Sequence, residues 1–253
     1  MIREDARRLQ QSVGVLAAGA PVVADLFAAA RERCVTLTFC NPLSLRVARH
    51  DPAYIDALAH FDRVHADGIL LAALATRLRG VPVVRLSFDG NSLAAEVLRV
   101  SAAANVPVAL VGGREGVALR AAATLTTEAG IRVVFHCHGY FAGDADVDAA
   151  IAAIRASGAG LVVVGMGAGA QEAFINRLRG SGWHGLATSC GGYLDQVAAG
   201  GSARYYPHWV NALHLRAPWR LLHEPRRLLP RYSIGYWPFY VAACRLLLAR
   251  RSS

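Results

Sequence analysis

The stretch from residue 161 to residue 178 constrains the fold of this chain most. It opens with the apolar run Leu161–Val164, continues through a glycine-rich segment over 165–170 and ends in a helical pattern over 173–178. A strand that leads through a glycine-rich turn into a helix N-terminus binds anions well, because unpaired backbone N–H groups and the helix dipole both point at the ligand. We therefore expect a ligand with a phosphate group at this turn.

The same stretch also fits the dinucleotide-binding fingerprint, as Gly165-x-Gly167-x-x-Ala170. That fingerprint requires an acidic residue about 20 positions later, at the end of the next strand. The next strand pattern covers 186–190, and two glycines follow it instead. An NAD(P)-dependent Rossmann oxidoreductase therefore stays an alternative, and a nucleotide sugar or another phosphate ligand is favoured.

Strand and helix patterns alternate along most of the chain, which predicts an α/β fold with a Rossmann-like, doubly wound, mostly parallel sheet. We expect this core to occupy residues 1–200. Strands are predicted over 35–40, 61–66, 81–86, 105–111, 131–136, 160–164 and 186–190. Helices are predicted over 22–31, 43–49, 52–60, 69–79, 93–104, 117–129 and 146–157.

The five cysteines and the N-terminal residues indicate a cytoplasmic protein. The number of cysteines is odd, the chain contains no Cys-x-x-Cys pair, and most of the cysteines lie in apolar runs, as reduced core residues do. The mixed composition of residues 1–8 argues against a cleaved signal peptide.

The positive charge is concentrated in residues 201–253, which we interpret as a basic, amphipathic, helical appendage. Nine arginines and one acidic residue, Glu224, give this segment a net charge of +8, out of +9 for the whole chain. Arginine and aromatic side chains mixed with leucines suit a segment that lies in the interface of an anionic membrane. Two alternatives remain: a C-terminal helix packed on the core, and a non-enzymatic membrane-surface scaffold. Nucleic-acid binding is not favoured, because the charge lies at one end beside an apolar segment.

Asp67 is the strongest candidate catalytic side chain. It ends the strand predicted over 61–66 and precedes Gly68. A carboxylate at the C-terminal end of a strand points into the crevice where open α/β sheets bind ligands. A helix N-cap is an equally good interpretation of Asp67 from the residues alone.

A second strand, glycine loop and helix unit follows at 105–129, and Gly112, Gly113 and Gly116 form its loop. We expect this loop to contact the ligand as well. His136 and His138 share one face of a strand, but no further ligand at suitable spacing accompanies them, so we favour a structural or substrate-contacting pair over a metal site.

Motifs spread along the chain resemble those of the WecG/TagA/CpsF glycosyltransferases (glycosyltransferase family 26). They are Asn41-Pro42, Asp67-Gly68, Gly112-Gly113 with Gly116, His138-Gly139-Tyr140-Phe141, Gly165-x-Gly167 with Gln171-Glu172, Gly191-Gly192 with Asp195, and Glu224-Pro225-Arg226-Arg227-Leu228 with Arg231-Tyr232. The resemblance implies a Rossmann-like core with a basic appendage that brings the enzyme to the membrane. It also implies inverting, metal-independent transfer of a sugar from a UDP-sugar, the co-substrate, to a polyprenyl-diphosphate-linked saccharide, without any cofactor.

The resemblance also implies roles for individual residues. Asp67 corresponds to the general base, and Gln171 to a further catalytic-site residue. Arginines of the appendage are expected to complete the site over the diphosphate. The substrate-binding residues predicted in this way are Thr38, Asn41, Arg85, Gly112, Gly113, Glu115, His138, Tyr140, Gly165, Gly167, Glu172, Asp195, Arg220, Arg226, Arg227 and Arg231.

An Asp-x-Asp motif, which metal-dependent transferases commonly use, occurs at Asp144-x-Asp146, in a predicted helix start. Arginine would then hold the diphosphate, because its fork matches phosphate oxygens.

Three departures from the family pattern bear on the donor sugar. The chain has Gly169-Ala170-Gln171-Glu172 where most relatives have Pro-Lys-Gln-Glu; Arg85 is displaced from its usual spacing; and Arg216 stands where Glu is common. These changes suggest an exopolysaccharide enzyme that uses UDP-glucose rather than UDP-N-acetylmannosamine or its uronic acid. We expect it at the inner face of the plasma membrane, and a homo-oligomer is left open.

Overall fold

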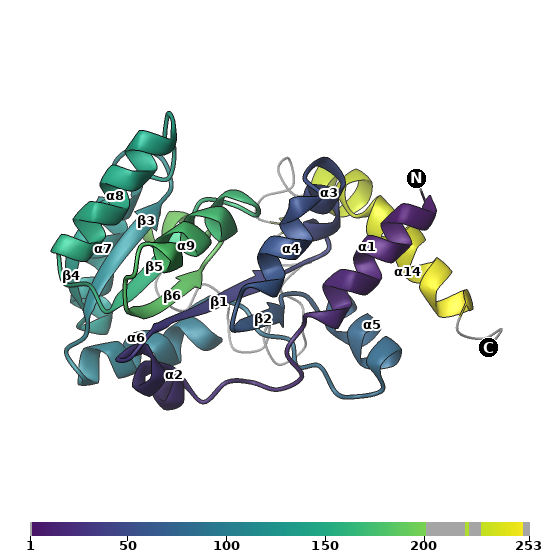
Figure 1. The fold of residues 1–253 in the computed structure, drawn as a ribbon, viewed down its shortest axis with the longest axis horizontal. Coiled ribbons are helices and arrows are strands. Elements are labelled where there is room, and N and C mark those ends of the chain that lie inside the picture. The colour runs from purple at the N-terminus through teal and green to yellow at the C-terminus, as the bar shows by residue number, and fades with distance from the viewer. Residues whose placement is uncertain (1, 201–220, 223–228, 250–253) are drawn as a thin grey trace.

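A six-stranded, all-parallel sheet forms the centre of the molecule (Figure 1). This computed structural model describes residues 2–200, 221–222 and 229–249. The strands are β1 (Cys34–Cys40), β2 (Arg63–Ala66), β3 (Pro107–Gly112), β4 (Arg132–Cys137), β5 (Leu161–Gly165) and β6 (Gly185–Ser189). Their order across the sheet is β2-β1-β6-β5-β3-β4. The predicted α/β, Rossmann-like class is confirmed.

Helices cover both faces of the sheet and enclose two separate hydrophobic clusters. On one face the cluster includes side chains of α1 (Ile2–Gly14), α3 (Ser44–His50), α4 (Ala53–Ala59), α5 (Ile69–Arg79), α8 (Asp144–Ala156), α9 (Ala170–Gly180) and α14 (Trp237–Ala249). On the other face it includes side chains of α2 (Val23–Ala30), α6 (Leu93–Ala103), α7 (Val117–Ala129) and α10 (Tyr193–Ala198).

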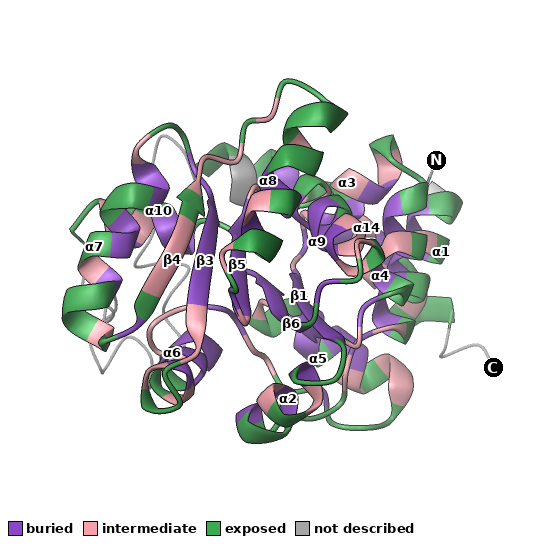
Figure 2. Cartoon of the chain, turned by 60° about the vertical axis from the view of Figure 1, so that its left-hand side comes forward, coloured by how far each residue is buried: buried purple, intermediate pink, exposed green. Residues whose placement is uncertain are grey.

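The continuous apolar runs of the central strands follow from this double coverage. In β5, Val162 and Val164 face one cluster while Leu161 and Val163 face the other, and all four are buried. A strand with both faces buried needs apolar residues at every position. Figure 2 shows the central strands as buried, whereas the edge strand β4 is mostly half-buried.

Neighbouring strands β3 and β5 send their chains to opposite faces of the sheet. β3 continues into α7, which contributes to one cluster, and β5 continues into α9, which contributes to the other. In open α/β sheets, ligands bind in the crevice outside the carboxyl ends of strands at such a switch in topology. The fold therefore directs attention to the edge of the sheet where all six strands end.

The prediction of a strand over 81–86 is wrong. Only a single bridge forms there, between Arg85 and Ala66 of β2. The backbone N–H of Val84 donates to Ala18 O, and that of Leu86 donates to Ala66 O. Because the segment pairs alternately with two different parts of the chain, no continuous ladder can form. Pro82 also lacks the N–H that a ladder requires.

The helix α1 was not predicted, although its buried side chains Ala6, Leu9 and Val13 follow a helical period. It lies beside α14, as Figure 1 shows, and Phe239 and Ala242 of α14 are buried in the same cluster. For residues 237–249 the structure thus shows a C-terminal helix packed on the core, the alternative to a membrane-interface segment.

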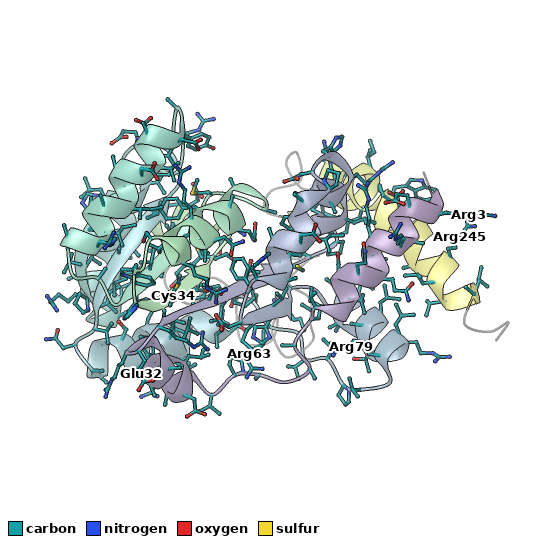
Figure 3. All side chains as sticks on the ribbon, in the orientation of Figure 1. Arg3, Glu32, Cys34, Arg63, Arg79 and Arg245 are labelled. Carbon is teal, nitrogen blue, oxygen red and sulfur yellow. The ribbon has the colours of Figure 1, made fainter. Side chains whose placement is uncertain are left out.

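Arg3 of α1 and Arg245 of α14 are both exposed on this helix pair (Figure 3). Among the helices of the described residues, none combines the length and the apolar character that crossing a membrane requires.

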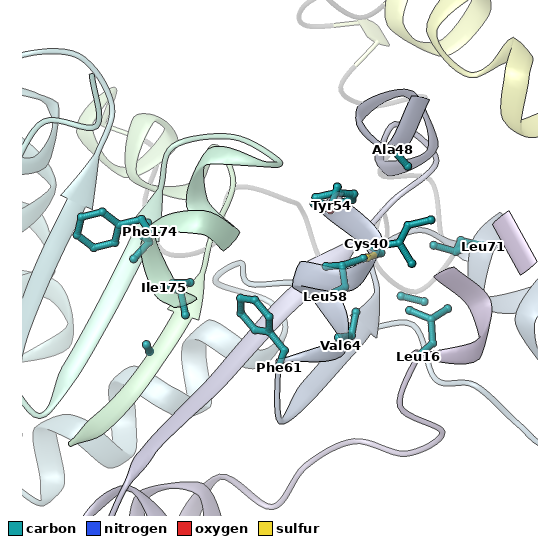
Figure 4. Packing of buried hydrophobic residues seen from close by; sticks show 14 of the residues in the cluster. Leu16, Cys40, Ala48, Tyr54, Leu58, Phe61, Val64, Leu71, Phe174 and Ile175 are labelled. Atoms are coloured by element: carbon teal, nitrogen blue, oxygen red, sulfur yellow. The ribbon is translucent and has the colours of Figure 1, made fainter. Parts of the chain in front are cut away.

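The five cysteines are free thiols. Cys34, Cys40 and Cys190 are buried, as expected of core residues, whereas Cys137 is half-buried and Cys244 is exposed. Burial raises the pKa of Cys40 and of Cys190 to about 12, so both stay protonated at neutral pH. Cys40 ends β1 and packs among Tyr54, Leu58 and Leu71, which form a well-packed layer close to the strand ends (Figure 4).

Candidate active site

The carboxyl ends of the strands bring the predicted site residues to one edge of the sheet. Thr38 lies near the end of β1, Asp67 follows β2, and Gly112 and Gly165 end β3 and β5. Neighbouring strands lie about 4.8 Å apart, so the ends of β1 and β3, three strands apart, are about 14 Å from each other. A ligand that contacts both ends must be elongated.

A buried carboxylate, Glu172, organises one half of this edge. Glu172 is fully buried in the first turn of α9, and its Oε2 accepts a hydrogen bond from the Gly169 N–H at 2.6 Å. Its Oε1 accepts from the Thr38 hydroxyl at 2.6 Å, and Thr38 Oγ1 also lies 2.9 Å from Ser189 Oγ. These contacts join β1, β6 and α9.

Gln171 completes this network. Its Nε2 donates to Glu172 Oε1 at 2.9 Å, and the side chain is 4% exposed. None of the described residues offers a hydrogen-bond partner to its Oε1. The structure thus brings Thr38, Gln171 and Glu172, all predicted from the sequence, into direct contact, and it adds Ser189, which was not predicted.

Asp67 forms the centre of a second group. Its Oδ1 lies 3.4 Å from Arg85 Nη2, and the same nitrogen donates to Ser87 Oγ at 2.8 Å and lies 3.8 Å from Asp89 Oδ2. The Asp67 side chain is 37% exposed, so a substrate can reach it. The structure therefore pairs Arg85 with Asp67 in spite of the displaced sequence motif.

The N-cap interpretation of Asp67 is wrong. The N-cap of α5 is Gly68, and no side chain caps this helix. Gly68 has a φ of +133°, which strongly favours glycine, and this conformation separates the end of β2 from the start of α5. The Asp67 N–H donates to Cys40 O at 2.6 Å, which ties the residue to the end of β1.

Asn41 is partly engaged by its own turn. Its Oδ1 accepts from the Leu43 N–H at 2.9 Å, as in an Asx turn, and its N–H donates to Ser44 Oγ at 3.1 Å. The residue follows β1 directly and thus lies at the same edge as Asp67.

The glycine loops after β3 and β5 touch each other through their backbones. The Gly113 N–H donates to Gly165 O at 3.2 Å, and a Cβ at Gly112 would lie 2.4 Å from Gly165 O. The Gly139 N–H, after β4, donates to Gly113 O at 2.9 Å. Glycine is therefore required at position 112 by close packing between the two loops.

The two helix N-termini behind these loops differ. In α9, Glu172 forms the glutamate half of a capping box, since the N-cap Gly169 has no side chain. The Gly169 N–H that we expected to meet an external anion therefore already binds an internal carboxylate. The N-terminus of α7 has no side-chain cap and no acidic residue in its first turn. Among the two, α7 offers the better position for a phosphate group.

His138, Glu115 and Tyr140 lie at the far end of the same edge, beyond β3 and β4. His138 Nδ1 accepts from the Tyr140 N–H at 3.2 Å, and His138 Nε2 lies 3.7 Å from Glu115 Oε2. The Tyr140 side chain is largely exposed. Within the described part of the chain, no three His, Cys, Asp or Glu side chains are grouped as a metal site requires.

Both carboxylates of the Asp-x-Asp motif have partners within the protein. Asp144 and Asp146 belong to the first turn of α8, as predicted. Asp144 pairs with Arg177 at 2.7 Å, and Asp146 accepts from the Ala142 N–H at 3.0 Å.

The structure is less informative about the remaining predicted residues. Asp195 is exposed in the first turn of α10. Arg220, Arg226 and Arg227 lie outside the described residues. Arg231 begins the π-helix Arg231–Gly235, and only its backbone is described.

His65 is a further buried group that the sequence analysis did not identify. It is fully buried in β2, two residues before Asp67, and neither ring nitrogen has a hydrogen-bond partner among the described residues. Burial, with a smaller contribution from the charge of Arg63, lowers the pKa of His65 to about 4, so the ring is neutral at physiological pH. The centroid of the His65 ring lies 6.0 Å from the centroid of the Phe39 ring.

Two comparisons relate this chain to known proteins. The model of a family described as "Glycosyl transferase WecG/TagA/CpsF family" matches residues 12–253. A UDP-Gal:alpha-D-GlcNAc-diphosphoundecaprenol beta-1,4-galactosyltransferase from Shigella boydii is 25% identical over 206 residues, which cover 81% of this chain and 84% of the relative.

Proposed function

Because the chain belongs to the WecG/TagA/CpsF family of glycosyltransferases, we propose that it moves a sugar from a UDP-sugar to a saccharide linked to polyprenyl diphosphate. The relative from Shigella boydii acts on a diphosphoundecaprenol-linked GlcNAc, which supports an acceptor of this class. Because the chain belongs to a glycosyltransferase family, no observation on the described residues favours an oxidoreductase or a non-enzymatic scaffold.

The observation that carries this proposal is the position of Asp67. Its partly exposed carboxylate lies at the end of β2 beside Arg85, on the same edge as the two glycine loops. An inverting transfer needs a carboxylate at the acceptor and electropositive groups at the leaving diphosphate. Both are available at this edge of the sheet.

The reaction proceeds in one displacement. Asp67 accepts the proton of the acceptor hydroxyl while the hydroxyl oxygen bonds to the anomeric carbon of the donor sugar. The bond from that carbon to the diphosphate oxygen breaks on the opposite side, UDP leaves with the electron pair, and the anomeric configuration inverts. The ion pair with Arg85 holds Asp67 at the end of β2.

The donor lies across the strand ends. Its diphosphate contacts the N-terminus of α7 and the Gly112–Gly116 loop. The first turn of α7 carries no acidic residue, and the Glu115 side chain of the loop is 89% exposed and lies 3.7 Å from His138. The exposed Tyr140 with His138, and Asp195 on α10, are the candidates for the nucleoside end. The sugar then extends past Gly165 and Gly167 towards Gln171 and Thr38.

Metal independence and the role of arginine are further parts of the proposal. Asp144 and Asp146 are engaged in α8, so this Asp-x-Asp motif does not supply a diphosphate-bound cation. Arg220, Arg226, Arg227 and Arg231 would neutralise the diphosphate in its place.

The substrate and location follow the same reasoning. We propose a hexose donor such as UDP-glucose or UDP-galactose, and a role in exopolysaccharide assembly. A lipid-linked acceptor requires contact with the membrane, which the basic appendage would provide at the inner face of the plasma membrane.

Transfer from a panel of radiolabelled UDP-sugars to synthetic lipid-diphosphate-glucose and lipid-diphosphate-N-acetylglucosamine, with EDTA present, tests this proposal. We expect one donor and acceptor pair to give product, and the anomeric configuration of that product, determined by NMR, to be opposite to that of the donor. Folded protein that gives no product with any pair in the presence of lipid or detergent would contradict the proposed reaction. Product that appears only when divalent cations replace EDTA would contradict metal independence.

A further inference from the structure

A carbonyl oxygen in the site lacks a hydrogen-bond partner. Gln171 Oε1 is buried, and no described residue donates to it. A buried acceptor without a donor costs about 1–3 kcal/mol, so such groups are kept where another molecule completes them. The loop that directly precedes Gln171 in the chain contains Gly167 and Gly169, both at positive φ, and the inference requires that the surroundings of the oxygen shift to admit a hydroxyl.

The orientation of this amide is set by Glu172. Only the NH₂ group of Gln171 can donate to a carboxylate, so the contact of 2.9 Å between Gln171 Nε2 and Glu172 Oε1 fixes which end of the amide is which. The carbonyl oxygen therefore points the other way. On the side away from Glu172, Gln171 therefore presents an acceptor to a substrate.

Glu172 is itself held in place from three directions. The Gly169 N–H, the Thr38 hydroxyl and the Gln171 amide all donate to it, and its position in the first turn of α9 is favourable for a negative charge. The negative charge that stabilises this network also disfavours a phosphate group at the same helix N-terminus.

We propose that Glu172 is a positioning residue that presents the Gln171 carbonyl oxygen to a sugar hydroxyl, so that the loop before α9 recognises sugar and the loop before α7 recognises phosphate. This inference rests on the proposed glycosyltransferase function. The hydroxyl belongs either to the donor sugar or to the acceptor sugar, and both present the same chemistry.

The substitution Glu172→Gln tests the inference. The Oε1 of the new amide can still accept from Gly169, but its NH₂ group then faces the NH₂ group of Gln171. Gln171 must rotate to remove this clash between two donors, and its own NH₂ group then faces the sugar. The double variant Gln171→Glu with Glu172→Gln restores an acceptor in that position. Glu96→Gln, on the exposed face of α6, is the matched control.

The readout is the loss of kcat/KM when single hydroxyls of the donor or the acceptor sugar are replaced by fluorine, which cannot donate a hydrogen bond. In the wild type and in Glu96→Gln, replacing the hydroxyl at one position of the sugar should lower kcat/KM about 10-fold to 100-fold. In Glu172→Gln that loss should shrink to about 3-fold or less, and in the double variant it should return. The series in which the sensitive position occurs, donor or acceptor, identifies the source of the hydroxyl.

UDP binding, measured by calorimetry, separates this inference from the proposed function. We expect the UDP Kd of Glu172→Gln to stay within about 2-fold of the wild type, since the carboxylate lies away from the diphosphate. UDP affinity raised 10-fold or more would place the diphosphate at α9 and overturn the inference. If Glu172→Gln shows the same losses of kcat/KM across the fluorinated sugars as the wild type, the inference is overturned too. A wild type that neither binds UDP nor transfers sugar would contradict the proposed function itself.

Discussion

The two glycine loops of this molecule have nearly the same sequence pattern and different chemistry. Each follows a buried strand and precedes a helix, β3 before α7 and β5 before α9. In α9 the third helical residue is Glu172, which is buried and caps the helix. In α7 the third helical residue is Leu119, which is largely exposed, and the N-terminus has no cap.

This difference shows that a glycine-rich turn before a helix does not by itself define a phosphate site. The backbone N–H groups at such a turn can bind an anion from the same chain as well as a ligand. A glutamate at the third helical position can reach back to the N-cap N–H and take the place of the ligand there. One loop thus has an internal anion and the other has room for an external one. Three substitutions test this difference between the two loops and the site beside them.

The largest effect is expected for Asp67→Asn, which removes the proposed base and lies outside both loops. Transfer should fall by about 10²-fold to 10⁴-fold, because the acceptor hydroxyl loses its proton acceptor, while the UDP Kd should stay unchanged. Steady-state kinetics and calorimetry on the same preparation measure both quantities.

Asp89→Asn is the matched control, since Asp89 shares Arg85 with Asp67. It should reduce transfer far less than Asp67→Asn does. Near wild-type turnover in Asp67→Asn would remove Asp67 from the base role.

A smaller effect is expected for Gly112→Ala, which forces the two loops apart. The new Cβ would lie 2.4 Å from Gly165 O, so the backbones must separate. We expect the free energy of unfolding to fall by about 1–3 kcal/mol and the UDP Kd to rise at least 10-fold. Chemical denaturation and calorimetry measure these changes.

Gly167→Ala is the control, because a Cβ there meets nothing within 4 Å and costs only the strain of its positive φ, about 1 kcal/mol. Equal losses of UDP affinity in both variants would argue against a special contact at Gly112.

The smallest effect is expected for Leu119→Glu, which gives α7 the acidic residue that α9 already has. The carboxylate should compete with the diphosphate for the backbone donors and raise the UDP Kd about 2-fold to 5-fold at low salt. Leu119→Gln keeps a similar size without the charge and should bind UDP as the wild type does. Titrations at low and high salt distinguish the two, and tighter binding in Leu119→Glu would contradict a phosphate position at α7.

Local patterns predicted the core well because each strand and helix carries its own signal. The strand and helix predictions over 35–190 agree with the structure within about three residues, apart from 81–86. That segment has the composition of a strand but pairs with two different partners, and no local pattern records the partner of a segment. The helix α1 did carry a helical period in its apolar residues, so its absence from the prediction was avoidable.

The sequence indicated which residues lie at the candidate site, but it indicated few of the contacts between them. The pattern Gly169-x-x-Glu172 is a recognisable capping signal, so the internal anion of α9 could have been anticipated. The pairing of Arg85 with Asp67, and the burial of His65, depend on how β2 meets the 81–86 segment and β1. Tertiary packing determines both, and the sequence shows neither.

The contact between α1 and α14 has a consequence for how the protein is made. During synthesis α1 emerges before the other helices of the described chain, while its partner α14 is the last of them to emerge. The helices α3, α4 and α5 can cover part of the apolar side of α1 earlier, but the part that α14 covers stays open until nearly all of the described chain is made. Such a nonlocal contact slows folding and leaves the nascent chain prone to aggregation. For recombinant work, a shortened protein without residues 201–253 would also lose part of its core, because α14 would be missing. Insolubility of such a protein would then report incomplete folding, and the proposed membrane role of this segment is better examined with a substitution of the exposed Arg245.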